Sequence, residues 1–172
     1  MKIMAIDPGN IESAYCTMFE DYRPLNFEKI DNLHLAELLE SRYFASVDRF
    51  VIERVACYGM PVGREVFNTC EWIGRFTQII LSQYGRMPHY ILRMDEKMEI
   101  CHDVRAGDSN IRRALIDRFA QHDLKNGKGT KKNPDFFYGF AKDIWAAYAV
   151  GYTYIQRMGR EAEEDAEKSR GL

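Results

Sequence analysis

The stretch Met1-Lys-Ile-Met-Ala-Ile-Asp7-Pro8-Gly9-Asn10 decides the fold. Its apolar run ends abruptly at Asp7, and Pro8 and Gly9 force the chain to turn, because proline cannot donate to a sheet ladder and glycine accepts positive φ. The strand-like segment Ser13–Phe19 follows, so we expect a β-hairpin. Asp7 either only initiates this turn or holds a metal ion at the end of a buried strand. Partner carboxylates further along the chain are needed to decide between the two.

Composition and charge bound the class of protein. The chain has 172 residues, of which 46% are hydrophobic and 29% charged, as expected for one soluble globular domain. The sequence contains no apolar run that could span a bilayer, no recognisable signal peptide and no Cys-x-x-Cys pair, so we expect reduced cysteines and a cytoplasmic location. The net charge of −2 gives no hint of a polyanionic partner, but residues 125–132 carry four lysines and no acid.

The remaining chain reads as alternating strands and helices. We expect strands at 25–30, 50–53 and 90–92. We expect helices at 33–43 with Asn32 as its cap, at 64–84, from 109 with Asp108 or Ser109 as its cap, and from about 139 to beyond 158. Alanines and a glycine in the last helix indicate close packing on a sheet. This order predicts an α/β fold, a mixed sheet flanked by helices, with one domain over residues 1–158 and an acidic, flexible tail over 159–172.

Three carboxylates stand out in this pattern. Asp7 ends the first strand, Glu53 ends the apolar strand Phe50-Val-Ile, and Asp143 lies in the first turns of the last helix among apolar neighbours. A charge in such surroundings is costly unless it is paired. We therefore expect the three acids to converge on a divalent cation, and oxygen ligands beside a substrate phosphate suit Mg²⁺ or Mn²⁺. Two such ions about 3.5–4 Å apart can activate water and stabilise the leaving oxygen of a phosphodiester.

The chain resembles a phage-type member of the RuvC Holliday-junction resolvases, within the RNase H-like superfamily. The residues that carry the resemblance are Ile6-Asp7-Pro8-Gly9, Phe50-Val-Ile-Glu53-Arg-Val and Lys142-Asp143-Ile-Trp-Ala-Ala-Tyr-Ala-Val150. It implies an RNase H-like mixed five-stranded sheet and places the acidic metal ligands at Asp7, Glu53 and Asp143. It also implies Lys97 as a catalytic cation beside the scissile phosphate.

The sequence departs from the family at several positions. A second acid one helical turn after Asp143 is expected, but Ala146 stands there, so the site uses three carboxylates or recruits Asp103, Glu96 or Asp135 as a fourth. The position of the junction-wedging aromatic matches Ala56, with Tyr58 two residues on. A second family cation matches Asp108, with Arg105 as the nearest basic substitute. The DNA-binding candidates are Tyr58, Arg105, Arg112, Lys125, Lys128, Lys131 and Lys132.

The resemblance implies a metal-dependent, structure-selective endonuclease that cleaves Holliday junctions and other branched DNA as a homodimer, with the 64–84 helix as the dimer element. A location in the host cytoplasm follows if the chain is phage-encoded, with a role in recombination, repair or DNA packaging. Three alternatives stay open. They are a related nuclease acting on structured RNA, an actin-like ATP-binding domain whose phosphate hairpin also begins Asp-x-Gly, and a catalytically silent junction-binding module.

Overall fold

The computed structural model describes residues 1–57, 59 and 61–170, and for residues 162–170 only the course of the backbone. Within this part the chain forms five strands and five helices. In chain order these are β1 (Lys2–Asp7), β2 (Glu12–Phe19), β3 (Pro24–Asp31), α1 (Asn32–Glu40), β4 (Arg49–Arg54), α2 (Arg64–Tyr84), β5 (His89–Leu92), α3 (Arg93–Cys101), α4 (Asp108–Phe119) and α5 (Ile144–Arg170). None of the described helices is both long and apolar enough to cross a membrane.

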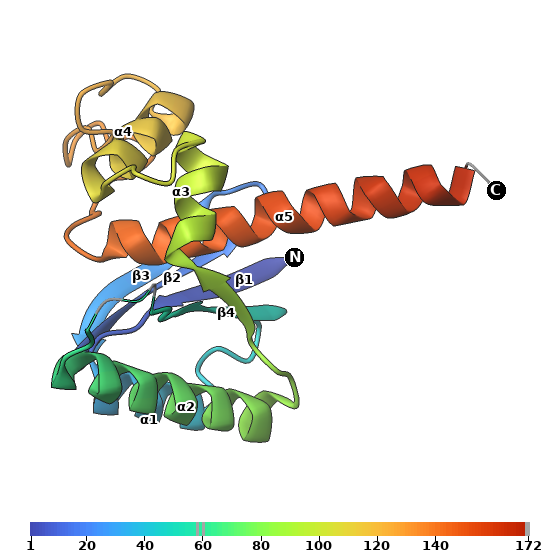
Figure 1. Cartoon of the computed structure of the whole chain (residues 1–172). Coiled ribbons are helices and arrows are strands. Elements are labelled where there is room, and N and C mark those ends of the chain that lie inside the picture. Colours follow the sequence, from blue (N-terminus) through green and yellow to red (C-terminus); the bar gives the residue numbers. More distant parts are fainter. Residues whose placement is uncertain (58, 60, 171–172) are drawn as a thin grey trace.

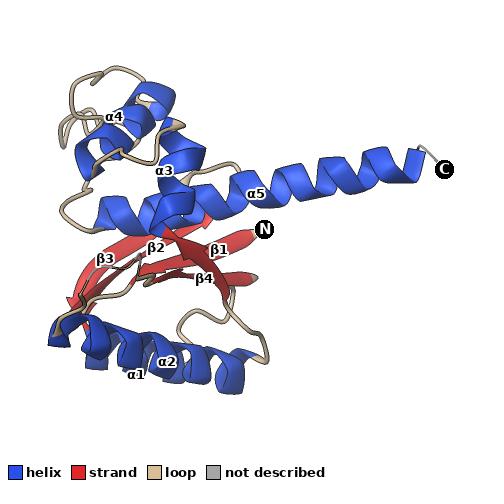
Figure 2. Ribbon diagram, in the orientation of Figure 1, coloured by secondary structure: helices blue, strands red, loops and turns tan. Residues whose placement is uncertain are grey.

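The five strands form one mixed sheet in the order β3-β2-β1-β4-β5. The first three strands make an antiparallel meander, whereas β1, β4 and β5 run parallel to one another. In the β1–β4 pair, Ile6 lies opposite Ile52. Helices α1 and α2 cover one face, and α5 crosses the other face beneath α3 and α4 (Figures 1 and 2). The predicted mixed five-stranded α/β fold is therefore confirmed.

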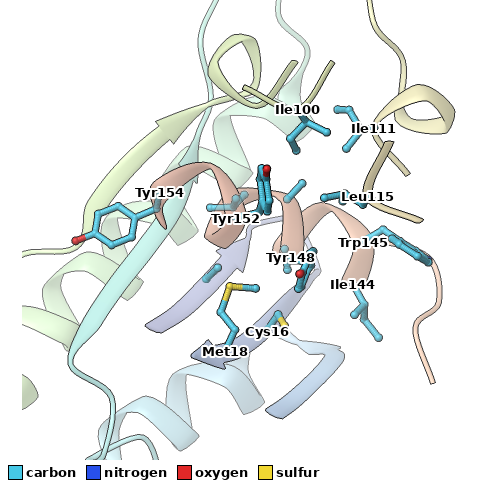
Figure 3. Packing of buried hydrophobic residues seen from close by; sticks show 14 of the residues in the cluster. Cys16, Met18, Ile100, Ile111, Leu115, Ile144, Trp145, Tyr148, Tyr152 and Tyr154 are labelled. Carbon is cyan, nitrogen blue, oxygen red and sulfur yellow. The ribbon is translucent and has the colours of Figure 1, made fainter. Parts of the chain in front are cut away.

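Each face of the sheet has its own apolar core because side chains alternate along a strand. Met4, Ile6 and Phe50 pack with the α1–α2 layer. Ala5 and Val51 point the other way and pack with α5, α3 and α4. Figure 3 shows this second core, in which side chains of α5 lie between the sheet and α4. The residue that follows Ile6 on β1, and the one that follows Ile52 on β4, must therefore point toward the α5 side.

Helix α5 lies unusually close to the sheet at Gly151. A Cβ atom there would stand 2.6 Å from Met18 Sδ and 3.1 Å from Ala5 Cβ, so a larger residue requires the helix or Met18 to shift. This contact confirms the close packing that the alanine- and glycine-containing sequence of the last helix predicts. It fixes the height of α5 above β1.

Several predicted boundaries are wrong. Asp31, not Asn32, caps α1 by accepting a hydrogen bond from Leu33 N at 2.8 Å. The N-cap of α4 is Gly107, whose N–H donates to Asn110 Oδ1. The last helix begins at Ile144, five residues later than predicted, and α3 was not predicted at all.

The acidic tail continues as the backbone of α5 to Arg170. Its predicted flexibility, and the domain boundary at residue 158, stay predictions.

Candidate active site

Asp7 and Glu53 lie side by side at the carboxyl ends of two parallel strands. Each follows a residue of the Ile6–Ile52 pair, so both side chains point toward the α5 side of the sheet. The two carboxyl groups share a hydrogen bond. Burial and then the charge of Glu53 raise the pKa of Asp7 to about 8. Burial also raises the pKa of Glu53, while the hydrogen bond from Asp7 opposes that rise. Burial thus raises the pKa of both acids, and their shared hydrogen bond needs a proton on one of the two carboxyl groups.

Asp143 reaches the same site from the start of α5. It precedes the helix rather than lying in its first turns, and its carbonyl accepts the first helical hydrogen bond, from Ala147 N at 3.0 Å. Its carboxylate is bound by Lys29 of β3, with 2.6 Å between Nζ and Oδ2, and Lys29 also lies 3.5 Å from Glu12. The charge of Asp143 contributes to the raised pKa of Asp7. Asp143 therefore acts on Asp7 through its charge, and the convergence of Asp7, Glu53 and Asp143 on one cation stays a prediction.

A fourth acid, Glu96, enters the site from α3. Its side chain is completely buried, and Arg93 donates to one of its oxygens while also binding Asp108. The other oxygen, Oε1, has no hydrogen-bond partner. Burial raises the pKa of Glu96 well above its ordinary value, and the charges of Glu53 and Asp7 raise it further. Sequence reasoning named Glu96 only as one of three possible fourth acids, and it did not single out Arg93. The spacing of Arg93 and Glu96, three residues apart, was the available signal.

The other two candidates for a fourth acid do not join the site. Asp103 is exposed and accepts a hydrogen bond from Arg105 N at 2.9 Å. Asp135 is buried inside the loop that follows α4, where it accepts four backbone N–H groups at 2.6–2.9 Å. Burial alone would raise the pKa of Asp135, but these donors outweigh it and hold the pKa well below its ordinary value. Both residues therefore organise loops.

A basic groove leads away from the acids between α4 and the start of α5. It encloses about 550 Å³, and Arg112, Lys125, Lys142 and Trp145 line it. A smaller pocket shares three of these residues and reaches Asp143. The Arg112 guanidinium stacks 5.0 Å from the centre of the Trp145 ring. Arg112 and Lys125 were predicted to contact DNA, and the structure places both in this groove. Lys142 was not predicted.

The remaining predicted residues lie elsewhere or outside the described residues. Lys131 and Lys132 are exposed in the Asp135 loop, and Lys128 is partly exposed in it. Arg105 is exposed and pairs with Asp103. Lys97 follows Glu96 on α3 and is partly exposed. Tyr58 lies outside the described residues. The roles assigned to these residues stay predictions.

The acids fit a divalent cation in chemistry but are not arranged as a finished ion site. In the described part of the chain, no three His, Cys, Asp or Glu side chains form a group that could hold a metal ion as they stand. Lys29 forms a salt bridge with Asp143, and Arg93 forms one with Glu96, so two of the carboxylates already have a side-chain cation as partner. The donor set is nevertheless all carboxylate oxygen, which suits a hard divalent cation. The partnerless oxygen of Glu96 is a further sign that positive charge is missing.

No protein-family model and no curated protein matches this chain. Among solved structures, it is similar to RuvC of Thermus thermophilus, with 15% identity, a TM-score of 0.64, and coverage of 92% of this chain and 97% of that one. The same protein in complex with a Holliday junction substrate gives 15% identity, a TM-score of 0.65, and coverage of 92% and 96%. The fowlpox virus Holliday junction resolvase gives 18% identity, a TM-score of 0.52, and coverage of 91% and 99%. The chain therefore has a RuvC-like fold over almost its whole length.

Proposed function

We propose that this protein is a structure-selective endonuclease that hydrolyses phosphodiester bonds in Holliday junctions and other branched DNA. The observation that carries the proposal is the pair Asp7 and Glu53 at the ends of β1 and β4, with Asp143 acting on Asp7 through its charge and lining a pocket next to the basic groove. The similarity in fold to a RuvC structure with bound Holliday junction supports the substrate class. The phage type of the resolvase is part of the proposal.

The three acids would hold one or two Mg²⁺ or Mn²⁺ ions, which supply activation of water and stabilisation of the leaving oxygen when bound. Asp7 must lose its proton for this role, and Lys29 must share or release Asp143. The side chains of Arg112, Lys125 and Lys142 would hold the phosphates of the substrate strand along the groove. Lys97 would balance charge that develops on the scissile phosphate. Water attacks phosphorus, the P–O bond to the neighbouring 3′ oxygen breaks, and a 5′-phosphate and a 3′-hydroxyl remain at the nick.

A homodimer is part of the proposal, because two symmetric cuts in a junction require two sites. Helix α2 is the proposed dimer element. Its side chains Phe67 and Leu81 are 59% and 40% exposed, so they would be available to a second copy of the chain. Dimerisation through these residues is testable by sedimentation of the wild type beside Phe67→Glu.

A cleavage assay on four-way, three-way and linear DNA, with Mg²⁺ or with EDTA, tests the function. We expect nicks near branch points in Mg²⁺ only. Asp7→Asn should lower the cleavage rate by at least about 10³-fold, equivalent to several kcal/mol of lost cation stabilisation, yet still bind the junction. Asp103→Asn is the matched control and should cut normally. Equal cutting of linear DNA, preferential cutting of structured RNA, or full activity of Asp7→Asn would refute the proposal.

A further inference from the structure

Glu96 is a buried acid whose pairing is incomplete. The residue has no solvent exposure, and Arg93 binds only its Oε2 atom. Oε1 is buried and lacks any partner. A carboxylate has room for about four hydrogen bonds, so an acid kept only to pair with Arg93 would leave most of that capacity unused at considerable cost.

The surroundings of Glu96 make the missing partner a cation. Arg93, which binds Glu96, lines the same pocket as Asp143, so Glu96 lies behind the wall of that pocket. Arg93 is shared with a further acid, Asp108, so it cannot balance the cluster alone. A hydroxyl or amide donor could satisfy Oε1, but it would not allow Glu96, Glu53 and Asp7 to ionise together. A divalent cation satisfies both.

We infer that Glu96 is a fourth carboxylate ligand of the cation site, supplied by α3 and held in position by Arg93. The inference rests on the proposed function, since it assumes that Asp7, Glu53 and Asp143 bind the cation. Arg93 is a positioning residue in this arrangement: it fixes Oε2 and leaves Oε1 free. The site then draws ligands from β1, β4, α3 and the start of α5.

Binding of Mn²⁺ to the full-length protein without DNA tests the inference independently of cleavage. Isothermal titration calorimetry with MnCl₂ would compare the wild type with Asp7→Asn, Glu96→Gln and Glu99→Gln. Glu99 is the matched control because it lies on the same helix but pairs with Arg157 and Arg160 instead. We expect Glu96→Gln to weaken Mn²⁺ binding by at least about 10-fold, and Glu99→Gln to bind within about twofold of the wild type, a change too small to reflect a lost ligand.

The outcomes separate the two proposals. If Asp7→Asn loses Mn²⁺ while Glu96→Gln binds it like the wild type, the fourth-ligand inference fails and the proposed function stands. If the wild type binds no Mn²⁺, or Asp7→Asn binds it unchanged, both fail. Circular dichroism checks that each variant is folded. Should Glu96→Gln not fold, Glu96→Asp keeps the charge but draws the carboxylate back, and unchanged Mn²⁺ affinity in that variant would likewise overturn the inference.

Discussion

Asp135 and Asp7 both have limited contact with solvent, but their surroundings shift the pKa in opposite directions. Four backbone N–H groups converge on Asp135, which lowers its pKa. Asp7 instead faces Glu53 and Asp143, and its pKa rises to about 8. The loop supplies hydrogen-bond donors to the Asp135 carboxylate. At the strand ends, the carboxyl groups of Asp7 and Glu53 lie next to each other, and their charges repel.

We propose that this difference in pKa distinguishes a structural acid, Asp135, from a functional one, Asp7. A carboxylate that only stabilises a fold is most useful when the chain itself supplies all its donors. The cluster of Asp7, Glu53 and Glu96 lowers the stability of the protein on its own, and such a cluster persists where an external group can use it.

The largest effect on stability is expected at the loop. Asp135→Asn replaces two acceptor oxygens by one and removes the charge from four hydrogen bonds. We expect the free energy of unfolding to fall by about 2–3 kcal/mol, measured by urea denaturation. Asp103→Asn, at an exposed acid, is the control and should change little. An unaltered midpoint for Asp135→Asn would mean that the loop does not depend on this acid.

At the strand ends we expect a substitution to raise the free energy of unfolding rather than lower it. Asp7→Asn removes a group that must be kept protonated, so without divalent ions the variant should be more stable than the wild type at pH 7, by an amount on the order of 2 kcal/mol. Thermal unfolding in EDTA measures the difference. If the variant is less stable than the wild type, Asp7 stabilises the fold as Asp135 does, and the two acids do not differ in role.

The same acid sets a pH dependence. The pKa of Asp7 in the folded protein, about 8, lies above its ordinary value of 3.8, so between these values the unfolded chain binds fewer protons. The contribution of Asp7 to the free energy of unfolding is therefore fully present below about pH 4 and is lost as the pH rises through about 8. Urea denaturation of the wild type in EDTA should follow this decline, and Asp7→Asn should flatten it. A wild-type stability that rises between pH 5 and 8 would contradict the assignment.

A smaller effect is expected from Lys29, which occupies Asp143 at 2.6 Å. Because the pair is partly exposed, Lys29→Met should cost less than about 1 kcal/mol of stability. Mn²⁺ should bind severalfold more tightly to the variant, since no ammonium competes for Asp143. Calorimetric titration measures the change. Weaker binding would show that Lys29 helps to position the acid.

The smallest effect is expected on DNA affinity. The Asp135 loop presents lysines, and Lys125 lines the groove whereas Lys131 is exposed elsewhere in the loop. Lys125→Ala should weaken binding to a four-way junction by severalfold and reduce the slope of log K against log salt by about 1. Fluorescence anisotropy over a range of salt concentrations measures both quantities. An equal loss in Lys131→Ala would mean that the whole loop, not the groove, binds DNA.

The sequence was sufficient for the sheet, and it also named three acids whose roles stay predictions. In β1 and β4, a short apolar run precedes Asp7 and Glu53. A continuous apolar run of this kind is typical of a parallel strand that is buried on both faces. Helix α2 has a continuous apolar stripe, and its predicted bounds match the structure. In these elements the apolar residues of the sequence are the ones that the fold buries, so the sequence predicted them correctly.

The part that failed depends on contacts between distant segments. Helix α3 is short and rich in charge, so no apolar stripe marks it. Glu96 is buried only because α3 packs against α4 and α5, and Arg93 finds Asp108 fifteen residues later. The late start of α5 has a similar cause, since residues 139–143 form turns that bring Asp143 toward Lys29.

The contact at Gly151 makes the spacing of the site adjustable without altering any charged residue. Ala5, which Gly151 faces, lies two positions before Asp7 on β1, and Gly151 lies about two helical turns after Asp143. A methyl group at 151 requires Met18 or the helix to shift, and a shift of the helix would carry Asp143 with it. The lack of a side chain at Gly151 therefore permits the close approach of α5 to β1, and Asp143 stands at the start of that same helix.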